Sequence, residues 1–140
     1  MSSNTIAEPI TYFEDKVVSI KYHPDSNSIE NTWNGFANSD TYRANMNKIL
    51  EAFKKHKADS IMGDVANMKV VSVADQKWTN EVWQPEILKL GFKRNAIVVS
   101  GDIFNKITVE KIVNSTDSNA GVEYKYFSQR EKAFAWLRGE

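Results

Sequence analysis

The segment DSIMGDVANMKVVSVADQKWTNEVW, residues 59–83, decides the fold. It opens with a short, mostly apolar run that predicts a buried strand over residues 61–65, with Asp64 near its carboxyl end. A loop follows, and Ser72 then precedes a pattern typical of a helix. Because open α/β sheets bind ligands at the carboxyl ends of their strands, the segment predicts a site where this strand meets the next helix.

The chain before this segment predicts an antiparallel meander. Apolar residues alternate at 10–12, 18–22 and 29–33, which is the two-residue period of strands with one buried face. A polar turn and a loop around Pro24 separate the three strands. Residues 1–9 show no such period, and we expect a disordered or extended tail there.

Helical periods follow the meander. Apolar residues from Tyr42 to Phe53 recur at helical spacing, and Ser39 is the expected N-cap of that helix. The remaining expected elements are a helix from Ser72 that bends or restarts at Pro85, a strand at 96–99, a helix at 107–113 capped by Thr108, a strand at 122–126 and a last helix opened by a capping box at 128–131. A meander followed by βαβα units predicts one α/β domain over residues 10–140, with a mixed sheet and packed helices.

The composition excludes several classes of function. Eighteen basic residues balance eighteen acidic ones, so no positive field favours a nucleic-acid partner. The chain has no cysteine, which excludes disulfides, thiolate catalysis and cysteine metal sites. The purely apolar runs, such as residues 96–99, are too short to span a membrane, and the amino end lacks the features of a signal peptide. We therefore expect a soluble cytoplasmic protein.

No sequence motif predicts catalysis, a metal or a cofactor. His23 and His56 lie in different segments without further ligands at metal-binding spacing. The chain lacks a nucleophile elbow, and its isolated glycines do not form a phosphate-binding loop. An enzyme with Asp64 as general base stays an open alternative, which requires a desolvated cleft around that carboxylate.

Several short motifs occur in a characteristic order. They are Trp33-Asn34-Gly35, Asp64, Asp75-Gln76-Lys77-Trp78, Trp83-Gln84-Pro85, Gly91-Phe92-Lys93-Arg94-Asn95-Ala96 and Ala133-Phe134-Ala135-Trp136-Leu137. Together these motifs resemble the SpoIIAA-like family within the STAS (sulfate transporter and anti-sigma antagonist) superfamily, over roughly residues 10–138. The resemblance implies a β–α fold, use in the cytoplasm, and a regulatory or ligand-sensing role rather than catalysis.

One feature departs from the anti-sigma antagonists of that superfamily. Those proteins carry a phosphorylatable serine directly after an aspartate, at the start of the helix that follows the central strand. Here Val65 follows Asp64, and the nearest serine of the loop is Ser72, preceded by Val71. The resemblance therefore implies the fold and the location of the site but not the phosphorylation switch.

The candidate ligand-binding or partner surface comprises Asp64, Ser72, Trp78 and Trp83. Two interpretations stay open for each residue. Asp64 either orients a ligand or accepts backbone N–H groups of its own loop, and Ser72 either contacts a phosphate or caps its helix. The two tryptophans either line an apolar pocket or belong to the core, and their spacing of five positions keeps them from sharing one helix face.

We expect a non-catalytic regulatory or protein-interaction module. The alternative is a domain that binds a small molecule or lipid in a tryptophan-lined pocket near Asp64. The expected partner is accordingly a protein or a small apolar or amphipathic ligand, and an unpaired edge strand of the meander leaves a homodimer open. The proposed site requires the Asp64 carboxylate and the indoles of Trp78 and Trp83 to meet at one crevice.

Overall fold

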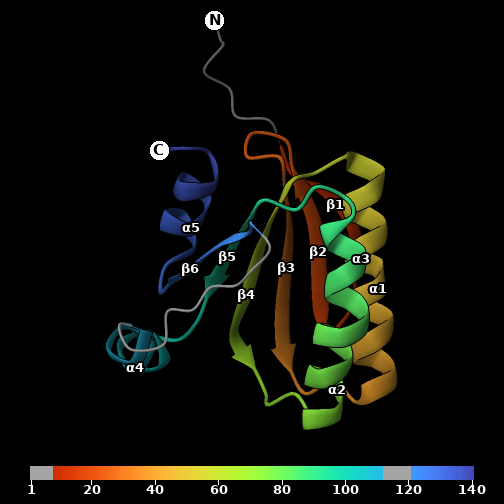
Figure 1. Cartoon of the computed structure of the whole chain (residues 1–140), viewed down its shortest axis with the longest axis vertical. Helices are drawn as coiled ribbons and strands as arrows, with labels where there is room; N and C mark the ends of the chain where they lie inside the picture. Colours follow the sequence, from red (N-terminus) through yellow and green to blue (C-terminus); the bar gives the residue numbers. More distant parts are fainter. Residues whose placement is uncertain (1–7, 112–120) are drawn as a thin grey trace, which may run out of the picture.

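A six-stranded sheet runs through the computed structural model, which describes residues 8–111 and 121–140 (Figure 1). The strands are β1 (Ile10–Glu14), β2 (Val18–His23), β3 (Ser28–Gly35), β4 (Ser60–Met68), β5 (Arg94–Val98) and β6 (Glu123–Phe127). They lie side by side in chain order; β1, β2 and β3 pair antiparallel, and β3 to β6 pair parallel. The expected mixed sheet, an antiparallel meander followed by βαβ units, is confirmed.

Helices cover both faces of the sheet. They are α1 (Ser39–His56), α2 (Val73–Trp78), the π-helical segment η1 (Thr79–Trp83), α3 (Gln84–Leu88), α4 (Gly101–Lys111) and α5 (Arg130–Leu137). Figure 1 shows α1, α2 and α3 together on one face and α5 on the other. We call these two faces the α1 face and the α5 face. No helix in the described ranges is both long and apolar enough to cross a membrane.

Each face carries its own apolar core, and strand β4 contributes to both. Ile61 packs in the core of the α1 face with α1, η1 and α3, whereas Met62 packs in the core of the α5 face. The two-residue period of a strand then turns Gly63 toward the α1 face and Asp64 toward the α5 face. This alternation decides which side chains reach each functional region.

Pro85 restarts a helix, as expected from its missing backbone N–H. It lies in the first turn of α3, where that donor is not needed. The π-helical segment η1 precedes it, and the N–H of Gln84 donates to the carbonyl of Thr79, five residues back. The chain therefore passes from α2 through η1 directly into α3, whose first turn contains the proline.

The N-cap of α1 differs from the expectation. Asn38 occupies that position, and its side chain accepts the backbone N–H of Thr41 at 2.9 Å. Ser39 is the first helical residue, and its hydroxyl donates to Asp75 at 2.7 Å. Asparagine caps helices as well as serine does, so the sequence contains two adjacent candidates for the N-cap. The prediction of Ser39 was therefore wrong by one position.

Three further boundaries also differ. Strand β4 extends to Met68 because it pairs with β3 beyond Val65. Helix α4 begins at Gly101, where the hydroxyl of Ser100 accepts the N–H of Ile103 at 3.3 Å, so Thr108 lies inside the helix instead of capping it. Helix α5 begins at Arg130 without a side-chain cap, so the predicted capping box at 128–131 is wrong.

Two expectations fall partly outside the described residues. The end of the helix expected at 107–113 lies there from residue 112, and so does most of the tail expected at residues 1–9.

Candidate ligand-binding pocket

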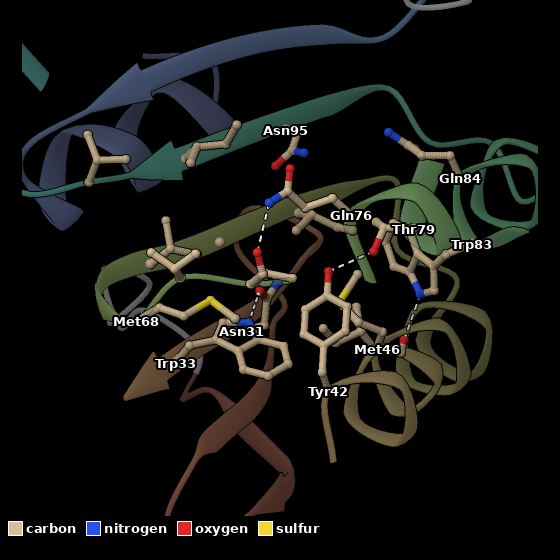
Figure 2. Close-up of a pocket in the computed structure, with 18 of the residues that line it drawn as sticks. Asn31, Trp33, Tyr42, Met46, Met68, Gln76, Thr79, Trp83, Gln84 and Asn95 are labelled. Atoms are coloured by element: carbon tan, nitrogen blue, oxygen red, sulfur yellow. Dashed lines mark hydrogen bonds between the residues drawn. The ribbon is translucent and has the colours of Figure 1, made fainter. Parts of the chain in front are cut away.

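A pocket of about 700 Å³ opens between the α1 face of the sheet and the helices that cover it (Figure 2). Strands β3 to β6 form its floor, and α1, α2, η1 and the start of α3 form its walls. This volume lies within the range of about 300–1,000 Å³ that is typical of small-molecule sites. The pocket is thus large enough for a ligand of ordinary metabolite or lipid size.

Aromatic and aliphatic side chains dominate the lining of this pocket. They are Trp33, Tyr42, Met46, Ile49, Ile61, Val65, Met68, Val70, Val71, Trp83, Ile97, Val99 and Tyr126. Gly63 lies among them in the middle of β4, where its missing side chain leaves space above the sheet. An apolar lining of this kind favours a ligand with a large apolar surface.

Hydrogen bonds hold the aromatic walls in place. The indole N–H of Trp33 donates to Asn31 Oδ1 at 2.9 Å, and that of Trp83 donates to the carbonyl of Met46 at 2.7 Å. The hydroxyl of Tyr42 is 2.7 Å from that of Thr79 (Figure 2). Because these polar atoms are already paired, the rings present their apolar surface to the pocket without moving.

A buried carboxylate ties α2 to α1 beside the pocket. Asp75 is 2% exposed; it accepts hydrogen bonds from Ser39 at 2.7 Å and from the Nε of Arg43 at 2.9 Å. The Ser39 hydroxyl, the Arg43 guanidinium and Ser72 together lower the pKa of Asp75 in spite of its burial. The guanidinium of Arg43 also lies over the ring of Trp78, 5.2 Å from its centroid. These contacts position the helical wall over the sheet.

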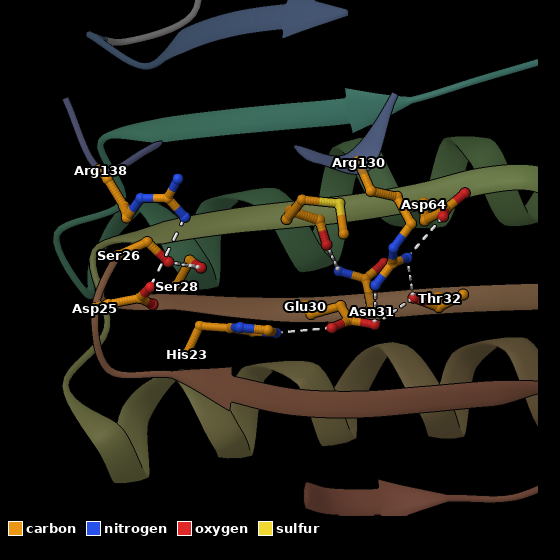
Figure 3. Close-up of polar contacts among 11 residues, drawn as sticks. His23, Asp25, Ser26, Ser28, Glu30, Asn31, Thr32, Asp64, Arg130 and Arg138 are labelled. Carbon is orange, nitrogen blue, oxygen red and sulfur yellow. Dashed lines mark hydrogen bonds and ion pairs between the residues drawn. The ribbon is translucent and has the colours of Figure 1, made fainter. Parts of the chain in front are cut away.

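Asp64 belongs to a polar network on the α5 face (Figure 3). Its Oδ2 pairs with Arg130 Nη1 at 2.7 Å, and its Oδ1 accepts the backbone N–H of Ala66 at 3.1 Å. Arg130 also donates to Glu30 at 2.9 Å and to Thr32 at 3.1 Å. The first helical residue of α5 is therefore anchored to strands β3 and β4.

Glu30 links this network to His23. Its Oε1 is 2.7 Å from His23 Nε2, and its Oε2 accepts the hydroxyl of Thr32 at 2.6 Å. Burial raises the pKa of Glu30, but hydrogen bonds from His23, Thr32 and Arg130 outweigh burial and lower the pKa from 4.5 to about 2. The carboxylate thus stays charged inside the protein because its neighbours donate to it.

The lowered pKa of Glu30 predicts a loss of stability in acid. Because the pKa of Glu30 is lower in the folded state than in the unfolded state, the charged carboxylate stabilises the fold. This stabilisation is complete at a pH above 4.5 and disappears as the pH falls toward about 2. From this shift we expect wild type to lose roughly 3 kcal/mol more than Glu30→Gln across that window. Urea unfolding of both proteins at a series of pH values measures the difference. Parallel pH profiles of the two proteins would contradict the assignment.

The structure separates the four residues of the expected site. Trp83 lines the pocket, whereas Asp64 faces the opposite side of the sheet. The expectation that Asp64 and the indoles meet at one crevice is therefore wrong, because the alternation of β4 turns Gly63, not Asp64, toward the pocket. Asp64 does accept a backbone N–H close by in sequence, but the donor, Ala66, lies in β4 and not in the expected loop.

The other two residues lie beside the pocket without lining it. Ser72 caps α2, and its hydroxyl accepts the N–H of Asp75 at 3.1 Å. Trp78 is half-buried, with its ring edge-on to Tyr42 at 6.4 Å between centroids. Trp78 and Trp83 do not share a face, as their spacing indicated. The sequence favoured a core position for Trp33 and gave no indication that Tyr42 lines a pocket, although both occur at inward positions of their predicted elements and both line it.

Comparison with known proteins identifies the fold family. The family model described as SpoIIAA-like matches residues 28–138. No curated protein matches the chain significantly in sequence. The crystal structure of an uncharacterized protein from Shewanella loihica PV-4, described as having a SpoIIAA-like fold, aligns over 98% of both chains with a TM-score of 0.57. At 19% identity that likeness shows the fold alone. Because the SpoIIAA-like family model matches most of its length, the chain belongs to the SpoIIAA-like family.

Proposed function

We propose that the protein is a non-catalytic binding module that holds a small, largely apolar molecule in the pocket on the α1 face. The observation that carries this proposal is the apolar pocket of about 700 Å³ with its fixed aromatic walls. Filling such a space with a ligand removes apolar surface from water on both partners, which is the main source of affinity at sites of this kind. The SpoIIAA-like family assignment supports use in the cytoplasm, which stays part of the proposal.

The hydrogen bonds that Asp64 already makes within the protein favour a binding function over a catalytic one. Both of its carboxylate oxygens are engaged, one by Arg130 and the other by the N–H of Ala66. A general base needs a free oxygen within reach of a substrate proton. Since Asp64 faces away from the pocket, it does not meet that requirement for a ligand bound there.

Filling the pocket from its floor tests the proposal. A Cβ atom at Gly63 would lie 3.4 Å from Asn31 Oδ1, an ordinary contact, and the two further methyl groups of Gly63→Val add volume to the pocket. We expect this variant to lose most of the wild-type affinity for diphenylhexatriene, a fluorescent hydrocarbon without polar atoms. Titration with this probe, followed by its fluorescence increase, measures the change.

A matched variant controls for nonspecific effects. Thr11→Val introduces the same side chain in the edge strand β1, away from the pocket, and is expected to keep the wild-type affinity. Unfolding curves show whether Gly63→Val remains folded. Equal probe binding by Gly63→Val and wild type, or no binding by wild type, would overturn the proposal.

A second candidate function is a regulatory protein-interaction module, supported by exposed apolar side chains. Phe36 follows β3, and Val70 and Val73 lie on either side of Ser72 after β4; they are 65%, 85% and 80% exposed. Apolar side chains this exposed are typical of interaction surfaces when they gather. Native mass spectrometry of protein purified from its own host tests this function. A bound protein that the triple variant Phe36→Ser, Val70→Ser, Val73→Ser no longer retains would support it, and a bare monomer would contradict it.

A further inference from the structure

One end of the pocket on the α1 face is polar but uncharged. Asn95 of β5 lines it there, next to its register partner Tyr124 of β6. The side-chain Nε2 of Gln84, at the start of α3, donates a hydrogen bond to the hydroxyl of Tyr124 at 3.0 Å. Figure 2 shows Gln84 on the opposite side of the pocket from Met68, beside which Lys69 lines the other end. The pocket therefore has two chemically different ends.

The polar end carries hydrogen-bonding groups without partners. Gln84 Oε1 is shielded from solvent and accepts no hydrogen bond from residues 8–111 or 121–140. The side-chain amide of Asn95 makes no hydrogen bond to any residue that the structure describes. The Oε1 atom of Gln84 is the buried case and Asn95 is half-buried; buried polar atoms are nearly always paired in folded proteins, and leaving one unpaired reduces stability. A polar group on a ligand would supply the missing partner at this end.

The charges around the pocket restrict what that polar group can be. Among the described residues that line the pocket, only Lys69 is charged. Lys69 follows β4, eight residues beyond Ile61, which is the register partner of Asn95. At a rise of about 3.3 Å per strand residue, Lys69 lies roughly 25 Å along the strand from the two amides. No cation there offsets the loss of hydration that a buried carboxylate or phosphate would suffer.

We propose that the ligand is an uncharged amphiphile whose hydroxyl or carboxamide group binds between Gln84 and Asn95. Its apolar body then extends along β4 and β5 toward Met68. A hydroxyl or carboxamide group both donates and accepts hydrogen bonds. It can therefore pair with the carbonyl oxygen or with the NH2 group of each side-chain amide. This inference rests on the proposed function, because it names the chemistry of a ligand for the same pocket.

Competition among ligands of equal chain length tests the inference. Decanol, decanamide and decanoate are each used to displace diphenylhexatriene from the wild-type protein at neutral pH. We expect decanol and decanamide to compete at least about ten-fold better than decanoate, because only decanoate must bury a charge. Equal or stronger competition by decanoate would overturn the inference.

Two variants locate the polar group of the ligand. Gln84→Met and Asn95→Leu keep the size of each side chain but remove its amide. Each is expected to weaken competition by decanol about ten-fold, the loss expected when a hydrogen bond to a buried group is removed. The affinity of each variant for diphenylhexatriene is measured in parallel so that competition is compared on the same scale, and unfolding curves show that the variants are folded.

The outcomes distinguish this inference from the proposed function. If wild type binds diphenylhexatriene but both variants retain full competition by decanol, the pocket binds ligands and the inferred polar end is wrong. If wild type binds neither diphenylhexatriene nor any of the three competitors, the proposed function and the inference both fail.

Discussion

Replacing Arg130 with methionine is expected to lower the free energy of unfolding by about 2–4 kcal/mol, as expected when one partner of a largely buried ion pair is removed. The substitution leaves Glu30 and Asp64 without their shared cation, although their side chains are only 5% and 11% exposed. The Arg130 side chain itself is 40% exposed, so water moderates the effect. Urea unfolding at neutral pH measures the change.

Arg138, the C-cap of the same helix, provides the matched control. Its guanidinium pairs with the exposed Glu140 at 2.7 Å and with Asp25 at 3.8 Å. Arg138→Met is therefore expected to cost no more than about 1 kcal/mol. Adding Glu30→Gln to Arg130→Met should recover part of the lost stability, because it removes one of the unpaired carboxylates. Equal costs for the two arginine variants would show that the network does not anchor α5.

Replacing Trp83 with alanine is expected to have the largest effect on the α1 face. The indole is 6% exposed, so its removal from the core should cost about 3–5 kcal/mol. The substitution also removes one wall of the pocket and leaves the carbonyl of Met46 without the indole donor. We therefore expect loss of both stability and diphenylhexatriene binding, measured by urea unfolding and by titration under conditions where the variant is folded.

Two further substitutions separate packing from binding. Trp83→Phe keeps an aromatic wall and loses mainly the hydrogen bond to Met46, at a cost of about 1 kcal/mol, so binding should persist. Trp78→Ala removes a half-buried indole that does not line the pocket, so probe affinity should stay close to that of wild type. A loss of probe affinity in Trp78→Ala as large as in Trp83→Ala would contradict this description of the pocket.

The elements of the sheet were predictable because their local patterns are strong. The alternation at 18–22 and 29–33 marks strands with one buried face, and β2 and β3 form there. The change to helical spacing after Gly35 marks α1. In each case neighbouring residues report the period, so no distant contact is needed to recognise the element.

The faces of β4 were not predictable in the same way. Ile61 and Met62 are both apolar because each face of this central strand is covered by helices. A continuous apolar run does not show which residues point toward which helix. The assignment of Asp64 to the pocket was therefore open to an error of one position, and Gly63 occupies that place instead.

Contacts between distant parts of the chain account for the features of the site that the local sequence did not predict. Arg130 reaches Asp64 across 66 positions of sequence, and Gln84 reaches Tyr124 across 40. Nothing in the local sequence around either residue indicates its partner. Both contacts depend on the order of strands in the sheet, which brings α5 over β4 and the start of α3 beside β6.

Nuclear magnetic resonance of the isotope-labelled protein, titrated with diphenylhexatriene, tests the central claim most directly. If the pocket on the α1 face is the binding site, the indole N–H signals of Trp33 and Trp83 and the backbone amide signal of Gly63 shift on titration. The indole signal of Trp136 and the side-chain signal of Arg130, both contributed by α5, stay in place. Shifts confined to Trp136 and Arg130, or no shift at saturating probe, would contradict the claim.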